Sequence, residues 1–282
     1  MFREEIPYIE ENLNPCPDFR RSNWNIAFGL QAIDGKVPSD YLVRLSKKQI
    51  AGEITFEELE LRLNLHYGKA LVPRGTMMVE EVKTSYSIDM KEEDSTEADY
   101  SSTRIAEILA TESFALNPGT LLGYHEQIFS GIEAFHYPVG QIRKVNISKA
   151  EKVLNGDSVL YSNFGVIRQT LNWDFDQEKG YDYQCLERSE KAHCVMKFIS
   201  SVWQIHPFRD GNTRTIATFA IKYLRYLGFE VDNKPFEHHS VFFRDALALA
   251  NYHKEGKTEK YLTMFTENLL LGGKHELVIE VK

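Results

Sequence analysis

A nine-residue polar segment between two helical patterns places the strongest constraint on how this chain folds. Residues 206–214 read His-Pro-Phe-Arg-Asp-Gly-Asn-Thr-Arg and join two stretches that have apolar residues at helical spacing. The sequence therefore predicts two buried helices joined by a tight polar turn, whose backbone amides open the second helix. The apolar residues are Val195, Phe198, Ile199 and Val202 upstream, and Ile216, Phe219, Ala220, Tyr223 and Leu227 downstream.

The residue types in this turn are those that handle phosphate. Gly211 lets the backbone approach an anion closely, and the N-terminus of a helix offers unpaired N–H groups and a positive dipole end. Arg214 lies in the first helical turn, where a cation is disfavoured unless it binds an anion. Asp210 is a typical Mg²⁺ ligand beside phosphates, and His206 can take a proton near neutral pH. Together they predict phosphoryl or nucleotidyl transfer.

Each of these residues also has a structural interpretation. A lone histidine at a helix end, such as His206, more often packs or caps than acts as a base. Asp210, Gly211 and Asn212 alone form an ordinary turn, with Asn212 as a plausible N-cap. The order in which His206, Phe208, Asp210, Gly211, Asn212 and Arg214 follow one another favours the functional interpretation.

The turn closely resembles the signature of the Fic family, H-x-F-x-D/E-G-N-G-R-x-x-R. Thr213 stands where the family has its second motif glycine, and Ala217 stands where the final arginine belongs. The resemblance extends over roughly residues 100–272, including Gly140-Gln-Ile-Arg and the Ile147-Ser-Lys segment after it. The residues in register with the signature are His206, Phe208, Asp210, Gly211, Asn212 and Arg214.

This resemblance implies transfer of a nucleotide monophosphate, most often AMP from ATP, to a Ser, Thr or Tyr hydroxyl of a target protein. It implies that His206 deprotonates the hydroxyl, that Asp210 holds Mg²⁺ against the α- and β-phosphates, and that Arg214 neutralises the departing pyrophosphate. The helix that ends near residue 250 resembles one that closes the nucleotide pocket. The implied nucleotide-binding residues are Phe208, Gly211, Asn212, Thr213, Arg214, Asn251 and Tyr252.

Residues 151–161 place Asn155-Gly156 between two short β-prone runs, which predicts a β-hairpin. This segment falls where the Fic family has its flap, whose exposed strand edge holds the target peptide by β-augmentation. An ordinary surface hairpin is the alternative. The docking residues implied are Leu154, Asn155, Gly156, Asp157, Ser158 and Val159.

Residues 22–70 predict a small helical unit, with a helix capped by Ser22, a second opened by Pro38-Ser39 and a third starting at Thr55. This unit resembles the antitoxins of some Fic proteins, in which a glutamate blocks the γ-phosphate site. Asp34 stands at the position of that glutamate, and Leu30 replaces the family's hydroxyl residue.

The inhibitory role of Asp34 has alternatives. The family glutamate pairs with the final motif arginine, which Ala217 replaces here, so Arg214 is the arginine that Asp34 could still reach. Asp34-Gly35 could equally be a helix C-terminal turn. Ser85 to Asp89 and Thr103 to Glu107 are weaker inhibitory candidates.

The expected fold is mainly α: a Fic-type helical bundle with a short β-hairpin flap, preceded by the small helical unit. We expect a regulatory unit over residues 1–70, a linker over 71–100 and a catalytic domain over 101–282. The net charge of −8 argues against non-specific binding to nucleic acid or to an anionic membrane. Three cysteines without metal-type spacing, and no leader or membrane segment, predict a reduced, cytoplasmic setting; a homo-oligomer stays open.

The leading interpretation is an autoregulated protein adenylyltransferase that uses ATP and Mg²⁺. Phosphotransferases of the death-on-curing type are an alternative, although they carry lysine where this chain has Thr213. A degenerate Fic module that binds a nucleotide or a partner without transfer is the non-enzymatic alternative. Thr213 and Ala217 favour it, and the intact His206 and Asp210 oppose it.

Overall fold

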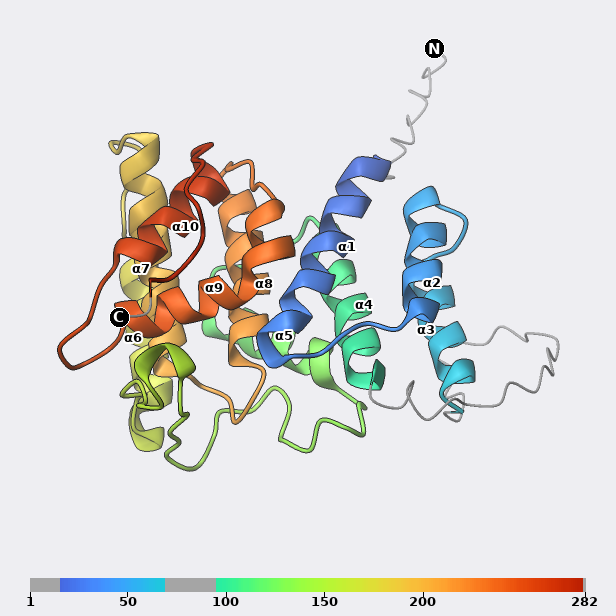
Figure 1. Ribbon diagram of the computed structural model, residues 1–282, viewed down its shortest axis with the longest axis horizontal. Coiled ribbons are helices and arrows are strands. Elements are labelled where there is room, and N and C mark those ends of the chain that lie inside the picture. Colours follow the sequence, from blue (N-terminus) through green and yellow to red (C-terminus); the bar gives the residue numbers. More distant parts are fainter. Residues whose placement is uncertain (1–15, 69–94, 281–282) are drawn as a thin grey trace, which may run out of the picture.

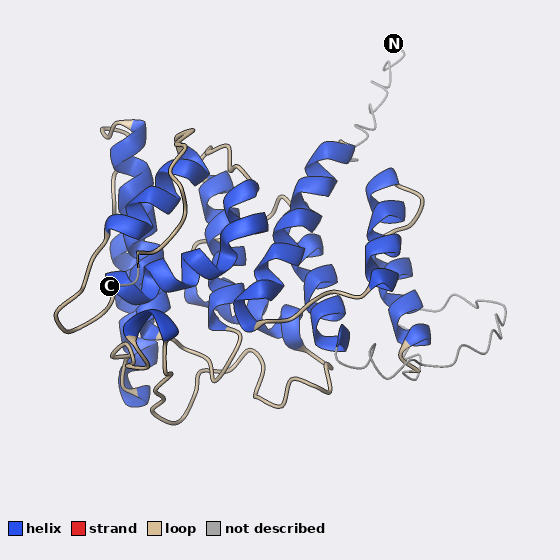
Figure 2. Ribbon diagram, viewed as in Figure 1, coloured by secondary structure: helices blue, strands red, loops and turns tan. Residues whose placement is uncertain are grey.

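The computed structural model describes residues 16–68 and 95–280, which form ten α-helices and no β-strand (Figures 1 and 2). The expectation of a mainly α fold is confirmed for these residues. The helices are α1 (Pro17–Gln31), α2 (Asp40–Ala51), α3 (Phe56–His66), α4 (Thr96–Ala110), α5 (Pro118–Phe129), α6 (Ile167–Lys179), α7 (Arg188–Ile205), α8 (Asn212–Tyr226), α9 (Lys234–Ala250) and α10 (Lys260–Leu270).

Side-chain caps start two of the first three helices. Ser39 accepts a hydrogen bond from the Leu42 amide at 3.1 Å, and Thr55 forms a capping box with Glu58, so α2 and α3 start as predicted. Helix α1 begins at Pro17 rather than after Ser22, because a proline at the first helical position has its φ angle already set for a helix.

Helix α1 is central to the packing. It lies against α4 and α9, and it also contacts α8, while α2 and α3 stand at one end of the molecule (Figure 1). Buried residues from α1, such as Trp24, belong to the same core as Phe219 of α8 and Phe265 of α10. Most of the expected linker over residues 71–100 lies outside the described residues, and α4 starts at Thr96, so the division into two units stays a prediction.

A buried carboxylate joins α4 to the first helices. Asp99 accepts hydrogen bonds from the Ser39 amide at 2.8 Å, from the Ser39 hydroxyl at 2.5 Å and from the Tyr67 hydroxyl at 2.8 Å. Burial raises the pKa of Asp99, and these three donors oppose that rise. One side chain thus fixes the start of α2 and the end of α3 against α4.

The prediction of a β-hairpin over residues 151–161 is wrong about the strands. Asn155 and Gly156 both have positive φ angles, of 55° and 88°, so the Asn-Gly turn forms. The chain around them is a 3-10 turn closed by hydrogen bonds between Glu151 and Asp157 and between Gly156 and Glu151. Leu154 and Glu151 point into the interior, and this packing outweighs the local β-propensity.

Within residues 16–68 and 95–280, no helix combines the length and the apolar character that crossing a bilayer requires.

Replacing Asp99 with Ala should lower the free energy of unfolding by about 3 kcal/mol, because it removes the acceptor of two buried donors on Ser39 and of the half-buried Tyr67 hydroxyl. Urea denaturation measures this change. The control is Asp40→Ala, which removes an exposed carboxylate from the first turn of α2 and should cost less than about 1 kcal/mol. Equal losses in both variants would contradict the joining role of Asp99.

Candidate active site

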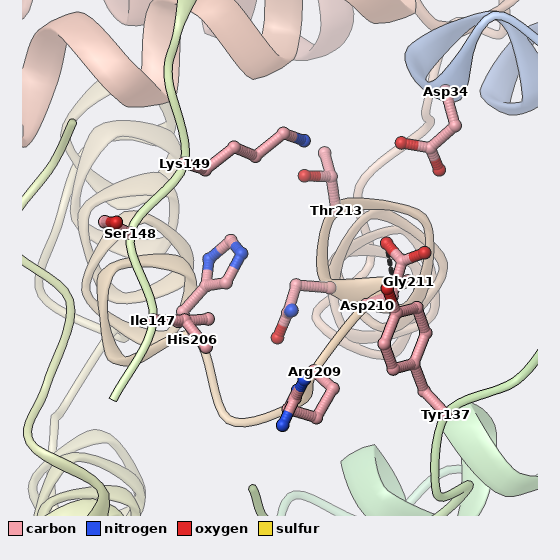
Figure 3. A pocket seen from close by; sticks show the side chains of 11 residues that line it. Asp34, Tyr137, Ile147, Ser148, Lys149, His206, Arg209, Asp210, Gly211 and Thr213 are labelled. Carbon is pink, nitrogen blue, oxygen red and sulfur yellow. Dashed lines mark hydrogen bonds between the residues drawn. The ribbon is translucent and has the colours of Figure 1, made fainter. Parts of the chain in front are cut away.

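A cavity of about 270 Å³ lies where the polar turn between α7 and α8 meets the segment around residue 148 and the end of the first helix (Figure 3). It is lined by Asp34, Tyr137, Ile147, Ser148, Lys149, His206, Arg209, Asp210, Gly211, Asn212 and Thr213. The structure thus gathers five of the predicted motif residues, together with Asp34, around one space.

The turn is held in one shape by its own side chains. The side chain of Asn212 accepts a hydrogen bond from the Phe208 N–H through Oδ1 at 2.9 Å. It also donates one to the Phe208 carbonyl through Nδ2 at 3.0 Å. Gly211 has a φ angle of 72°, and a Cβ atom there would lie 2.4 Å from the ring of Phe129, so only glycine fits. Helix α8 starts directly after Gly211, and its positive end therefore meets the cavity.

His206 ends α7 in the left-handed conformation, with a φ angle of 51°. Its Nδ1 lies 3.1 Å from the carbonyl of Trp203, which can only accept, so Nδ1 carries the proton and Nε2 keeps its lone pair. The ring stacks on Tyr161 with centroids 4.0 Å apart. Burial lowers the pKa of His206 to about 3, so the imidazole is neutral.

Asp210 supplies a carboxylate to the cavity. Its Oδ1 accepts the Gly211 N–H at 2.7 Å, while Oδ2 makes no such bond within the turn. Burial first, and then the nearby charge of Asp34, raise the pKa of Asp210. The described residues contain no group of three or more His, Cys, Asp and Glu side chains that could hold a metal by themselves. A single carboxylate facing an anion-binding helix end fits Mg²⁺ that takes its other ligands from phosphate and water.

Arg214 does not line the cavity, because it is fully buried behind the turn. Its Nη2 donates to Glu97 Oε1 at 2.8 Å, and its Nη1 donates to Gln31 Oε1 at 3.2 Å. Its Nε lies 2.7 Å from Asp34 Oδ2, although the N–H is not aligned for a hydrogen bond to that oxygen. All three guanidinium nitrogens therefore contact side chains from the first helices or α4.

Asp34 combines the two interpretations of its sequence position. It ends a 3-10 turn, Ala32–Asp34, that Gly35 closes with a φ angle of 67°, as expected for a helix C-terminal turn. Its carboxylate also lies between Arg214 and the cavity. Thr103 and Glu107, the weaker candidates on α4, do not line the cavity, and residues 85–89 lie outside the described residues.

Besides Arg214, three predicted nucleotide-binding side chains do not line the cavity. Phe208 is fully buried. Asn251 donates to Ser200 Oγ at 2.8 Å, and the Tyr252 hydroxyl donates to Asp157 at 2.8 Å. None of the predicted flap residues 154–159 lines the cavity either; Leu154 and Val159 are buried, and Asn155 and Gly156 form an exposed tip.

The two residues that depart from the Fic signature are both part of the packing. Thr213 Oγ1 accepts the indole N–H of Trp203 at 2.9 Å, which ties the start of α8 to the end of α7. Ala217 is fully buried. An arginine at position 217 would lie in the packed interior unless its neighbours moved.

Comparisons with known proteins agree with this geometry. Residues 115–224 match the model of the Fic/DOC family. Over these residues the chain is similar to the Fic/DOC family. The match covers α5, α7, the motif turn and most of α8, and it confirms the Fic resemblance of the motif segment. The antitoxin-like character of the first helices stays a prediction.

Solved structures of Fic domains share the fold. The N-terminal Fic domain of Bep8, a VirB-translocated effector of Bartonella sp. 1-1C, is 17% identical with a TM-score of 0.50, covering 65% of this chain and 87% of that one. The N-terminal Fic domain of an effector from Bartonella sp. AR 15-3 is 18% identical with a TM-score of 0.51, covering 64% and 83%. No protein with curated annotation matches significantly.

Sequence reasoning missed several groups around the Fic motif. Lys149 and Arg209 are the cationic side chains that line the cavity, and the Arg209 guanidinium lies 5.6 Å from the ring centre of Tyr137. Glu97 is the second carboxylate at Arg214. Lys149 belongs to the Ile-Ser-Lys segment that resembles the family, whereas Glu97 fell in the linker expected over residues 71–100 and was not predicted to reach the site.

The pKa of His206 predicts a pH dependence of stability. The unfolded chain takes up a proton at this histidine below about pH 6.5, whereas the folded protein does so only near pH 3. The contribution of the neutral His206 ring to the free energy of unfolding is therefore complete above pH 6.5. Between pH 6.5 and pH 3 it falls by about 1.4 kcal/mol for each pH unit. Urea denaturation at pH 7, 6 and 5 should show a shallower pH dependence for His206→Asn than for wild type. His136→Asn, an exposed control, should follow wild type.

Proposed function

We propose that this protein is a nucleotidyltransferase that moves AMP from ATP to a hydroxyl side chain of a target protein. One observation carries the proposal: the unprotonated Nε2 of His206, the carboxylate of Asp210 and the N-terminal end of α8 meet at one cavity. These are the three elements that such a transfer requires, namely a base, a site for a cation and a site for phosphate oxygens.

The proposed reaction follows from their chemistry. The target hydroxyl oxygen forms a bond to the α-phosphorus of ATP, the bond from that phosphorus to the bridging oxygen of the β-phosphate breaks, and pyrophosphate leaves. His206 Nε2 takes the hydroxyl proton, and its Nδ1–H bond to Trp203 keeps the imidazole in the right tautomer. The α8 end and the backbone of Gly211, Asn212 and Thr213 bind phosphate oxygens. Mg²⁺, held by Asp210, would neutralise charge on the phosphates.

We also propose that the first helices hold the site in a restrained state. Arg214 can neutralise pyrophosphate only if its guanidinium reaches the phosphates, yet in this structure Asp34, Glu97 and Gln31 contact it. Asp34 also lines the cavity, where its negative charge repels a triphosphate. Both effects support autoinhibition.

The target protein is proposed to dock beside the flap segment, whose exposed tip is Asn155-Gly156. Because this segment has no strand here, β-augmentation would require residues 157–161 to adopt an extended pairing with the target. A cytoplasmic setting, which supplies ATP and Mg²⁺, fits this proposal.

A nucleotide-binding module without transfer is the second candidate. The burial of Ala217 and the engaged guanidinium of Arg214 favour it, because neither position offers a cation to the cavity. The experiment below separates the two candidates.

The purified protein incubated with ATP and Mg²⁺ should gain the mass of one AMP on a hydroxyl residue, either its own or that of an added target. His206→Ala should lower the rate about 10²–10⁴-fold while nucleotide binding persists, because the phosphate site is built from backbone. Asp210→Ala should weaken Mg²⁺-dependent ATP binding and transfer together. Mass spectrometry measures transfer, and calorimetry measures binding.

The outcomes discriminate between the candidates. Transfer at the wild-type rate in His206→Ala would contradict the role of the base. Magnesium-dependent ATP binding without any transfer, for wild type and each nucleoside triphosphate, would select the binding module.

Releasing Arg214 should raise the rate of transfer. The double variant Asp34→Ala with Glu97→Gln removes both negative charges from its guanidinium, and the glutamine keeps a hydrogen-bond acceptor in the buried position. A tenfold rate increase corresponds to a barrier lowered by about 1.4 kcal/mol. We expect at least this increase, measured by incorporation of labelled AMP at saturating target.

The matched control is Asp40→Asn, which removes an exposed charge from α2 without contacting Arg214. It should leave the rate unchanged. If the double variant and a deletion of residues 1–70 both transfer at the wild-type rate, the first helices are structural and the inhibitory role is wrong.

A further inference from the structure

His125 on α5 is a buried histidine that the proposed reaction does not use. Its exposed fraction is 0%, yet both ring nitrogens have polar partners. Nδ1 lies 2.9 Å from the amide nitrogen of Gly140, and Nε2 lies 3.1 Å from the backbone carbonyl of Asp210. A single side chain therefore joins the loop before Arg143 to the carboxylate-bearing residue of the motif turn.

The partners settle the tautomer of His125. The amide of Gly140 can only donate, so Nδ1 carries the lone pair, and the carbonyl of Asp210 can only accept, so Nε2 carries the proton. This is the opposite tautomer to that of His206, whose Nδ1 is protonated. The neutral ring thus satisfies one donor and one acceptor at the same time.

The ring of His125 also packs against aromatic side chains of the motif turn and of α5. It stacks on Phe208, with centroids 3.8 Å apart and planes 16° from parallel, and it packs against Phe129 at 5.0 Å. Phe129 in turn lies against Gly211 and under the guanidinium of Arg214, 4.7 Å from its central carbon. The stack and the two hydrogen bonds therefore reach the turn at Phe208, Asp210 and Gly211.

We propose that His125 is the positioning residue of the motif turn. Its bond to the carbonyl of Asp210 fixes the Asp210–Gly211 peptide group, which lies between the carboxylate proposed to hold the cation and the backbone amides proposed to bind phosphate. The peptide after Asp210 carries the Gly211 N–H, which also binds Asp210 Oδ1. Rotation of that peptide would move the carboxylate and the start of α8 together. Partners of this second layer typically contribute 10–100-fold to metal affinity.

The inference deepens the proposed function, since it names a residue that prepares its site. Three variants dissect it. His125→Phe keeps the stack on Phe208 but removes both hydrogen bonds. His125→Gln can place an amide N–H near the position of Nε2 and so restore the bond to Asp210, whereas His125→Asn reaches only the position of Nδ1 and the amide of Gly140.

Two measurements use the full chain. Calorimetry with a non-hydrolysable ATP analogue and Mg²⁺ should show about tenfold weaker binding for His125→Phe and His125→Asn, and affinity near wild type for His125→Gln. Hydrogen exchange without any ligand should show faster exchange of the amides at residues 208–212 in the Phe and Asn variants alone. Leu121→Ala, a buried change on the same helix, is the control for lost stability.

The outcomes are distinct. Wild-type affinity and exchange in His125→Phe, or equal effects in Leu121→Ala at matched stability, would overturn the inference. If the variants behave as expected but wild type transfers no nucleotide, the positioning role stands and the proposed transfer fails. If wild type binds no nucleotide at all, the exchange of residues 208–212 decides the positioning role by itself.

Discussion

The burial of the Arg214 guanidinium is the constraint on which the arrangement of this protein depends. A fully buried arginine is costly unless its charge is matched, and here Asp34 and Glu97 match it. Lys36 lies 2.9 Å from the second oxygen of Glu97, so two cations and two anions form a neutral group. Removing one member of such a group typically costs about 3–5 kcal/mol. Because the carboxylates come from the end of the first helix and from α4, this group holds α8 against both.

Under the proposed function, the same interaction would set a competition at the candidate site. A triphosphate and the two carboxylates would then be alternative anionic partners for the Arg214 guanidinium, and each would lower the occupancy of the other. A ligand shifts such an equilibrium only by the difference in its affinity for the two states. If both proposals hold, the contacts of Arg214 with Asp34 and Glu97 and the affinity for the nucleotide are thermodynamically linked. Moving Asp34, which lines the cavity, away from Arg214 would then favour phosphate binding.

Local chemistry made part of this structure predictable. The helix starts at Ser39 and Thr55, the turn between α7 and α8, and the gathering of His206 and Asp210 all follow from caps, periodicity and motif. The prediction of β-strands over residues 151–161 was wrong because the structure of that segment depends on tertiary contacts, which a local sequence pattern does not predict. Residues 151–161 are rich in β-prone residues, yet residues 152–154 form a 3-10 turn and residues 157–161 have no regular secondary structure. Glu151 and Leu154 are buried in this arrangement.

The carboxylate of Glu97 illustrates the same limit at the site. In sequence it belongs to an acidic run, and only the fold shows that it meets an arginine more than a hundred positions away. Conversely, the resemblance of the helix that ends near residue 250 to a pocket-closing helix implied nucleotide contacts for Asn251 and Tyr252, whose side chains bind Ser200 and Asp157 here. A motif gives the residue types of a site, whereas the neighbours that engage them come from packing.

The hydrogen bond from Trp203 to Thr213 has an evolutionary consequence. A glycine at position 213 would match the signature but would leave the buried indole N–H of Trp203 without an acceptor, at a cost of about 1–3 kcal/mol. A change of Thr213 to glycine would therefore lower stability unless position 203 changed as well. We expect the two positions to be energetically coupled, so that a sequence with this tryptophan but without a hydroxyl at position 213 would need a compensating change elsewhere in its core.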